Sequence, residues 1–206
     1  MEQRSPEWFQ ARVGKVTASN VDNVIVKVKN GESQYKRKYR TQLITEQLTG
    51  KPVKIFMNEA MRHGVEYEDE ARNAYIAKLG LLKDVDVKEE GFVDHPTVMM
   101  SGASPDGMVG DEGLIEIKCP QATTHTEILQ NAVIPKRYIH QMMWQMACTG
   151  RKWCDFVCYH PDFPDDYKLF IKRVERDDDL IGRLERDIHE FAVEVMDSVK
   201  FIKENN

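Results

Sequence analysis

The stretch SPDGMVGDEGLIEIK, residues 104–118, has the pattern of a β-hairpin that carries charged residues on an apolar strand. Two apolar segments flank an acidic turn bounded by glycines, which is a hairpin signature. Because side chains alternate between the two faces of a strand, Glu116 and Lys118 point the same way. Folding the hairpin then brings Asp106 back beside Glu116.

This hairpin gathers two carboxylates and an ammonium group in a small volume. Clustered carboxylates repel one another unless a divalent cation lies between them, and Mg²⁺ is the usual cation of sites made of carboxylates and water. Lys118 adds a positive charge that can hold an anion or position a water. The set suits metal-assisted cleavage of phosphodiesters. The alternative is that Glu116 and Lys118 form a solvated salt bridge, which contributes little to stability.

Length and composition indicate one globular domain. The 206 residues can bury a substantial core, and 41% of them are hydrophobic. The chain has neither an apolar run near the ~20 residues of a membrane helix nor the apolar core of a signal peptide at its start. We therefore expect a cytoplasmic protein with no membrane association. The cysteines lack disulfide or zinc-site spacing, which favours buried reduced thiols: Cys119, Cys148, Cys154 and Cys158.

Charge is distributed unevenly along the chain. The net charge is −5, but residues 1–56 contain eleven Lys and Arg against five Asp and Glu, a balance of +6 that leaves −11 for the rest. The densest basic run is KRKYR, residues 36–40. A basic N-terminal part beside an acidic metal site would suit a nucleic-acid backbone. The alternative is that the run is only the solvated face of a helix.

The predicted elements alternate between helices and strands. Helices are predicted over residues 6–12, from 17 to 25, 33–49, 57–79, after Pro120, 135–147 and 178–203. Strands are predicted over residues 91–94, 99–102, 106–109, 114–118, 153–159 and 168–176. The inner stripe of helix 57–79 is predicted to be Val65, Ala71, Tyr75, Ile76 and Leu79. Without a repeat or linker, residues 1–206 are expected to form a single α/β domain with a central mixed sheet flanked by helices.

Each of three further groups of polar residues has a structural interpretation as well as a functional one. The acidic turn at residues 66–70 suits the start of a helix, but one carboxylate facing inward would add a metal ligand. Tyr138, Gln141 and Gln145 share one helix face, which is either a helix edge or a surface that reaches a substrate phosphate. Arg12 and Ser19 flank a loop between two helices, where they would make a phosphate cradle.

Several stretches, taken in order, resemble a known family. They are WFQAR (8–12) with VTAS (16–19), GVEYE (64–68) with DEAR (69–72), SPDG (104–107), EIKCP (116–120) and YIHQ (138–141). In these stretches the chain is similar to the phage lambda-type exonucleases, the YqaJ-like viral recombinase branch of the PD-(D/E)XK nucleases. The resemblance spans residues 8 to about 159. It implies a restriction-endonuclease-like nuclease core.

The resemblance implies roles for residues of the acidic site. Asp106 and Glu116 would be the principal metal ligands, with the backbone carbonyl of Ile117 completing one shell, and Glu68 would serve a second ion. Lys118 would orient and help to activate the attacking water. Gln141 corresponds to the amide of the family's Y-x-x-Q helix motif.

The resemblance also implies a place for the DNA end. Arg12 and Ser19 would hold the 5′-phosphate of the degraded strand, with Trp8 beside them in the substrate-binding part, to which residues 1–56 contribute. Lys29 and Met61 fall near the positions where the family opens the duplex end.

The implied activity is that of an alkaline exonuclease. It is a processive 5′→3′ digestion of linear double-stranded DNA by two Mg²⁺ ions, for which Mn²⁺ can substitute. It releases 5′-mononucleotides and leaves a 3′ single-stranded overhang for recombination by single-strand annealing. The family implies a ring-shaped homotrimer, a single-strand annealing protein as partner, and a phage or prophage protein acting in the bacterial cytoplasm. The sequence itself does not count the subunits.

Two other functions stay open. An endonuclease on the same fold would use the same acidic residues, although a pocket for a DNA end would be of no use to it. A non-catalytic DNA-binding or assembly protein would have no use for the acidic set and Lys118. The spacing of His63 to Glu68 does not match the histidine of some related nucleases, so His63 is interpreted as a DNA-facing or packing residue. Cys119 is interpreted as a packing residue.

Overall fold

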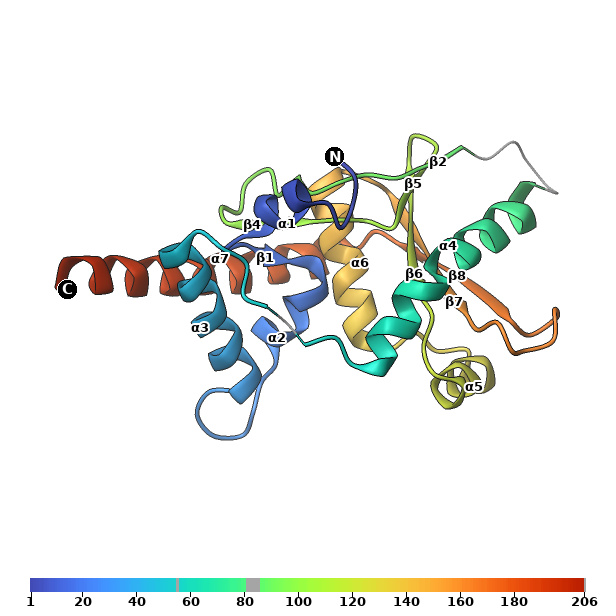
Figure 1. Cartoon of the computed structure of the whole chain (residues 1–206), viewed down its shortest axis with the longest axis horizontal. Helices are drawn as coiled ribbons and strands as arrows, with labels where there is room; N and C mark the ends of the chain where they lie inside the picture. Colours follow the sequence, from blue (N-terminus) through green and yellow to red (C-terminus); the bar gives the residue numbers. More distant parts are fainter. Residues whose placement is uncertain (55, 81–85, 206) are drawn as a thin grey trace.

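The computed structural model describes residues 1–54, 56–80 and 86–205, and its central feature is a five-stranded mixed sheet (Figure 1). The strand order is β2-β5-β6-β7-β8. β6 runs antiparallel to β5 and parallel to β7, and both outer strands pair antiparallel with their neighbours. The strands are β2 (Val87–Lys88), β5 (Gly107–Val109), β6 (Gly113–Lys118), β7 (Trp153–Tyr159) and β8 (Leu169–Glu175). The expected mixed sheet between helices is confirmed.

Helices cover both faces of this sheet. The α-helices of the chain are α1 (Pro6–Arg12), α2 (Val21–Ile25), α3 (Gln34–Thr49), α4 (Glu59–Gly80), α5 (Ala122–Asn131), α6 (Lys136–Thr149) and α7 (Asp178–Asn205). α4 packs against β6 and β7, and α6 packs against β7, whereas α2 and α3 pack along α7. One hydrophobic core joins α4 to the sheet through Ile115 and Ile117, and a larger one joins α6 and α7 to it through Leu114. Alternate residues of β6 therefore face different helices, as the pleat of a strand requires.

The alternation on β6 decides where its charged residues go. Glu116 and Lys118 lie on the same face of β6 as Leu114, which is the face towards α6. Glu116 is completely buried. The sequence of a strand that is buried on both faces is usually a nearly continuous run of apolar residues, and Glu116 interrupts that run in β6. A buried carboxylate must have polar partners, so the fold has to supply them at this point.

A second, three-stranded sheet was not predicted as a separate unit. It has the order β1-β4-β3 and consists of β1 (Val16–Thr17), β4 (Ser101–Ala103) and β3 (Val93–Asp94). The helix predicted to begin at Thr17 is displaced: Thr17 ends β1, a 3₁₀ turn covers Ala18–Asn20, and α2 follows. The reason is a long-range pairing, in which the Val16 amide donates to the Met100 carbonyl at 2.7 Å and β1 joins β4 in parallel.

The helix predictions are otherwise close to the structure. Ser5 caps α1 by accepting a hydrogen bond from the Trp8 amide at 3.2 Å. In α4, Ala71 and Tyr75 are buried as predicted, but Val65 is wrong as a core residue, because it is 41% exposed. The buried residues of α4 belong to its second half, which packs on β6 and β7, whereas Val65 lies in the first half.

The last helix, α7, is amphipathic along its length. Leu184, Ile188, Phe191 and Val195 are buried, as their spacing predicts. Beyond the large sheet α7 extends past α2 and α3, which pack along it (Figure 1). Across the described residues, no helix has the length and apolar character needed to cross a membrane.

The cysteines are buried free thiols, as expected. Burial raises the pKa of Cys119 and of Cys158 to about 12. Burial also raises the pKa of the Cys148 and Cys154 thiols. All four side chains are therefore protonated near neutral pH, and since the thiolate is the reactive form, they serve as packing groups.

His95 fixes the turn between β3 and β4, immediately before the segment that leads to Asp106. Its ring stacks on Trp144 with 4.5 Å between centroids, and its Nδ1 accepts hydrogen bonds from the amides of Thr97 (3.2 Å) and Val98 (3.0 Å). Burial lowers the pKa of His95 to about 4, with a further contribution from the charge of Arg176. Protonation at Nδ1 would break both hydrogen bonds that the ring accepts from these backbone amides.

The first prediction concerns this histidine and acid stability. Since the pKa of His95 falls from its ordinary 6.5 to about 4 on folding, the stability it contributes is present above pH 6.5 and is lost as the pH falls towards 4. Between pH 7 and pH 5 the free energy of unfolding should fall by about 2 kcal/mol through this residue. His95→Asn retains an acceptor for the turn but does not titrate. In urea unfolding at both pH values, the variant should be less stable at pH 7 and have a flatter pH dependence. An unchanged dependence would assign the effect to another group.

Candidate active site

The two carboxylates of the hairpin lie side by side. Asp106 precedes β5 and Glu116 lies in β6, and the register that pairs Gly107 with Ile115 places them opposite each other. Asp106 Oδ2 accepts a hydrogen bond of 2.6 Å from the Ile117 amide, which fixes the aspartate against β6. The expectation that the hairpin returns Asp106 to Glu116 is therefore confirmed in the geometry.

Glu116 receives the polar partners that its burial demands. Lys118 forms an ion pair with Oε1 from the same strand face. Gln141 Nε2 donates to Oε1 at 2.7 Å, and Gln145 Nε2 donates to Oε2 at 2.6 Å. The polar stripe of α6 thus points at Glu116. Gln145 was predicted to lie on this face, at a helix edge or near a substrate phosphate, and its contact with Glu116 was not predicted; its i+4 spacing from Gln141 was the available signal.

The electrostatics of this group are strongly coupled. Burial raises the pKa of Asp106 well above its ordinary value, and the negative charge of Glu116 raises it further, against the opposing effect of Lys118. For Lys118, burial opposes the charged form, but the carboxylates of Glu116 and Asp106 outweigh it and raise the lysine pKa. Lys118 is therefore an ammonium ion throughout the neutral and alkaline range. Its Nζ also lies 5.2 Å from the centre of the Tyr138 ring.

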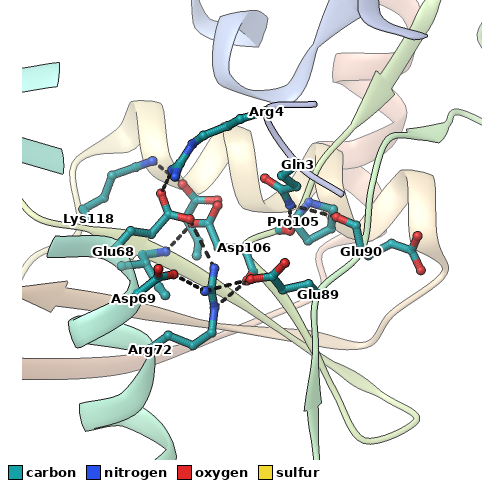
Figure 2. A network of polar contacts seen from close by, with 12 residues as sticks. Gln3, Arg4, Glu68, Asp69, Arg72, Glu89, Glu90, Pro105, Asp106 and Lys118 are labelled. Carbon is teal, nitrogen blue, oxygen red and sulfur yellow. Dashed lines mark hydrogen bonds and ion pairs between the residues drawn. The ribbon is translucent and has the colours of Figure 1, made fainter. Parts of the chain in front are cut away.

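Glu68 approaches this group from α4 (Figure 2). Its negative charge contributes to the raised pKa of Asp106, which places the two carboxylates within electrostatic reach of each other. Both oxygens of Glu68 are paired with guanidinium groups: Oε2 with Arg4, and Oε1 with Arg72 at 3.2 Å. Sequence analysis assigned no role to either arginine.

The donor set fits a divalent cation in its chemistry. Asp106 beside the fully buried Glu116, whose negative charge helps to raise the Asp106 pKa, makes a carboxylate pair that such a cation would neutralise. As they stand, the His, Cys, Asp and Glu side chains within residues 1–54, 56–80 and 86–205 form no group of three that could hold a metal. The pairing of Glu68 with Arg4 and Arg72 gives a physical reason, because those ion pairs occupy both of its oxygens.

A second polar cluster surrounds Arg12, at the end of α1. The guanidinium stacks on the Trp8 ring at 3.9 Å and donates to Ser104 Oγ at 3.2 Å, and Trp8 Nε1 donates to the same oxygen at 2.9 Å. Burial lowers the pKa of Arg12 to about 10. Ser104 lies two residues before Asp106, so this cluster adjoins the acidic group. Ser104 belongs to the SPDG stretch of the sequence, and its contacts with Arg12 and Trp8 were not predicted.

The remaining predicted residues lie outside these two clusters. Ser19 Oγ contacts Thr17 Oγ1 at 3.3 Å within its own turn. Lys29 is exposed in the segment between α2 and α3, and Met61 is exposed on the first turns of α4. Within the described part of the chain, neither side chain makes a polar contact with the acidic residues. His63 packs between Tyr67 and His160, and its Nδ1 lies 3.0 Å from the Cys119 carbonyl oxygen.

Comparison with known proteins extends over nearly the whole chain. The sequence matches the YqaJ-like viral recombinase domain over residues 7–152. It is similar to LHK-Exo, an alkaline exonuclease from Laribacter hongkongensis. With the crystal structure of LHK-Exo in complex with dAMP, the chain shares 45% sequence identity and a TM-score of 0.90, and the match covers 97% of each chain. A phage-related exonuclease from Haemophilus somnus 129PT has 16% identity, a TM-score of 0.73 and coverage of 93% of this chain and 96% of that one, a likeness of fold alone. No curated protein matches.

The second prediction follows from the raised pKa of Asp106. Because the folded state holds this proton more tightly than the unfolded state, the metal-free protein should lose stability as the pH rises through the raised pKa. Asp106→Asn retains the acceptor for the Ile117 amide and removes the charge. With divalent ions chelated at pH 8, the Tm of the variant should exceed that of the wild type, by about 2–4 °C for each kcal/mol relieved. Asp111→Asn, on the exposed turn, is the matched control and should leave the Tm unchanged. A lower Tm for Asp106→Asn would contradict the account.

Proposed function

The chain belongs to the YqaJ-like viral recombinase family, and we propose that it is a Mg²⁺-dependent 5′→3′ exonuclease acting on linear double-stranded DNA. The family and the 45% identity to an alkaline exonuclease support a phage-type nuclease that hydrolyses DNA. The observation that carries the proposal is the pair of Asp106 and the fully buried Glu116, with the ammonium of Lys118 beside it.

The acidic residues would hold the metal. Nucleases of this type generally use divalent cations, and we propose that Asp106, Glu116, Glu68 and the Ile117 carbonyl hold two Mg²⁺ ions, with Mn²⁺ as a possible substitute. When bound, such ions supply Lewis acidity to the attacking water and the leaving 3′-oxygen. Gln141 and Gln145 keep Glu116 oriented, since each holds one of its oxygens.

Lys118 would act through its fixed positive charge. In the metal-free protein the neighbouring carboxylates raise its pKa and keep it protonated. Its N–H groups would donate to the oxygen of the attacking water and so orient it. Its positive charge would counter the negative charge of the phosphodiester as a fifth oxygen approaches phosphorus.

The cluster at Arg12 would bind the end of the strand. A half-buried guanidinium with the Ser104 hydroxyl beside it is suited to a terminal phosphate. We propose that Arg12, Ser104 and Ser19 hold the 5′-phosphate, with Trp8 fixing the guanidinium plane by stacking. LHK-Exo was crystallised with dAMP, which is the class of product that release of 5′-mononucleotides would give.

The wider features of the proposal rest on the family. Residues 1–206 would act as one nuclease domain in which the basic residues of 1–56 contact the DNA backbone, with Lys29 and Met61 at the duplex end. A ring-shaped homotrimer enclosing the duplex would make digestion processive. The 3′ overhang would pass to a single-strand annealing protein in the cytoplasm of a bacterial host. An endonuclease is disfavoured, because the Arg12 cluster adjoins the acidic site as an end-binding pocket should.

The third prediction tests the activity itself. Strand-labelled linear duplex with 5′-phosphates should be shortened from its 5′ ends to mononucleotides in Mg²⁺, with no digestion after chelation, and covalently closed circles should stay intact. Lys118→Ala should lower the rate by roughly 10²–10³-fold, whereas Lys88→Ala, a change at an exposed lysine, should not. Cleavage of the circle would favour an endonuclease, and no cleavage of any duplex would favour a non-catalytic protein.

The fourth prediction concerns the 5′-phosphate. Arg12→Ala removes a charge-assisted interaction of about 1.5–3 kcal/mol. The KM for 5′-phosphorylated ends should therefore rise by roughly 10–150-fold, while digestion from 5′-hydroxyl ends stays near the wild-type level. Arg37→Ala, in the basic run of α3, is the matched control and should weaken both kinds of end equally. An equal loss on both ends for Arg12→Ala would remove Arg12 from the phosphate pocket.

A further inference from the structure

Two arginines from different parts of the chain share the carboxylate of Glu68. Arg4 comes from the segment before α1 and pairs with Oε2, whereas Arg72 lies one turn further along α4 and pairs with Oε1 at 3.2 Å (Figure 2). Arg72 has several further polar partners, whereas Arg4 has no further ion-pair partner among the described residues.

Arg72 is built into the structure. Its side chain is only 13% exposed, and besides Glu68 it pairs with Asp69 at 2.7 Å and Glu89 at 3.0 Å. Its Nε also donates to the backbone carbonyl of Asp106 at 3.3 Å. One planar guanidinium therefore ties Glu68 on α4 to the main chain of the aspartate at the acidic site.

The Arg4 side chain has fewer partners than the Arg72 side chain and is more exposed. The side chain of Arg4 is 44% exposed, and Glu68 is its one ion-pair partner among the described residues. The neighbouring Gln3 anchors the segment, because its amide donates to the carbonyls of Glu90 (2.8 Å) and Pro105 (2.7 Å). Arg4 itself has a left-handed backbone with φ of 66°, which is uncommon for a residue with a side chain.

We propose that the two arginines act on Glu68 in opposite ways. Arg72 is a positioning residue that keeps Oε1 beside Asp106 whether or not a cation is present. Arg4 is an exchangeable counter-ion that occupies Oε2 until a divalent cation takes its place. The inference rests on the proposed function, since it concerns the metal site of that function.

The difference in burial gives the physical reason. An exposed ion pair contributes little to stability, so a doubly charged ion that binds carboxylate oxygen directly can displace Arg4. Displacing Arg72 would strip a buried guanidinium of several partners at once, which costs far more. The exchange also explains why Glu68 does not close with the other acids into a three-ligand group in this structure.

The fifth prediction sets the two arginines against each other. Calorimetric titration of the full-length, metal-free protein with Mn²⁺ measures ion affinity without reference to cleavage. Arg4→Gln should bind Mn²⁺ roughly 2–5-fold more tightly than the wild type, because a competitor is lost. Arg72→Gln should bind at least about 10-fold more weakly, because a ligand loses its orientation. Arg186→Gln, an exposed site on α7, controls for the loss of one positive charge and should change nothing.

The double variant and a conservative one make the test sharper. In a Glu68→Gln background, Arg4→Gln should have no effect on Mn²⁺ affinity, since the contested oxygen has lost its charge. Arg72→Lys retains the charge without the planar fork and should stay weak, which matters if Arg72→Gln does not fold. Equal or same-direction shifts for the two arginines would overturn the inference. Absence of Mn²⁺ binding by the wild type would instead overturn the proposed function.

Discussion

The structure depends on placing a fully buried carboxylate, Glu116, in the middle of an apolar strand. An ionised group in that position is tolerated only when its charge and both of its oxygens are satisfied. β6 provides the ammonium of Lys118 two residues on, and α6 provides the amides of Gln141 and Gln145. The packing of α6 against the sheet is therefore needed both for the fold and for the acidic site, because it brings the two amides to Glu116. Asp106 adds a second negative charge that the protein's own groups leave incompletely compensated, as its raised pKa shows.

The sequence predicted the parts of the fold that local patterns encode. The hairpin, the long strands and most helix limits follow from alternation, capping and turn residues, and the acidic pair follows from the hairpin register. Strands were predicted at β3 and β4, but β1 was not, because its two residues are extended only through pairing with β4, and this pairing makes the three strands a separate sheet. Val65 was misplaced because the helical stripe does not show where α4 leaves the sheet. Ser104, Arg4 and Arg72 gained their places through contacts across the chain, which no local pattern displays.

The segment from Ser104 to Asp106 joins the two clusters that the proposed function uses. Ser104 receives hydrogen bonds from Arg12 and Trp8, and Asp106 is fixed to β6 two residues later. Pro105 lies between them and restricts the backbone there. The distance from the Arg12 cluster to the acidic pair is thus set by a short, stiff piece of main chain. In an exonuclease that holds a terminal phosphate, such a fixed spacing would determine which phosphodiester is presented for hydrolysis.

The state of the four buried thiols has a practical consequence for experiments on this protein. Because burial keeps each of them protonated and shielded, they should react slowly with maleimides under native conditions. A single cysteine introduced on the exposed face of α7 could then be labelled selectively without first replacing the native ones. Fluorescent or spin probes attached there would report on assembly or DNA loading in an otherwise unaltered chain.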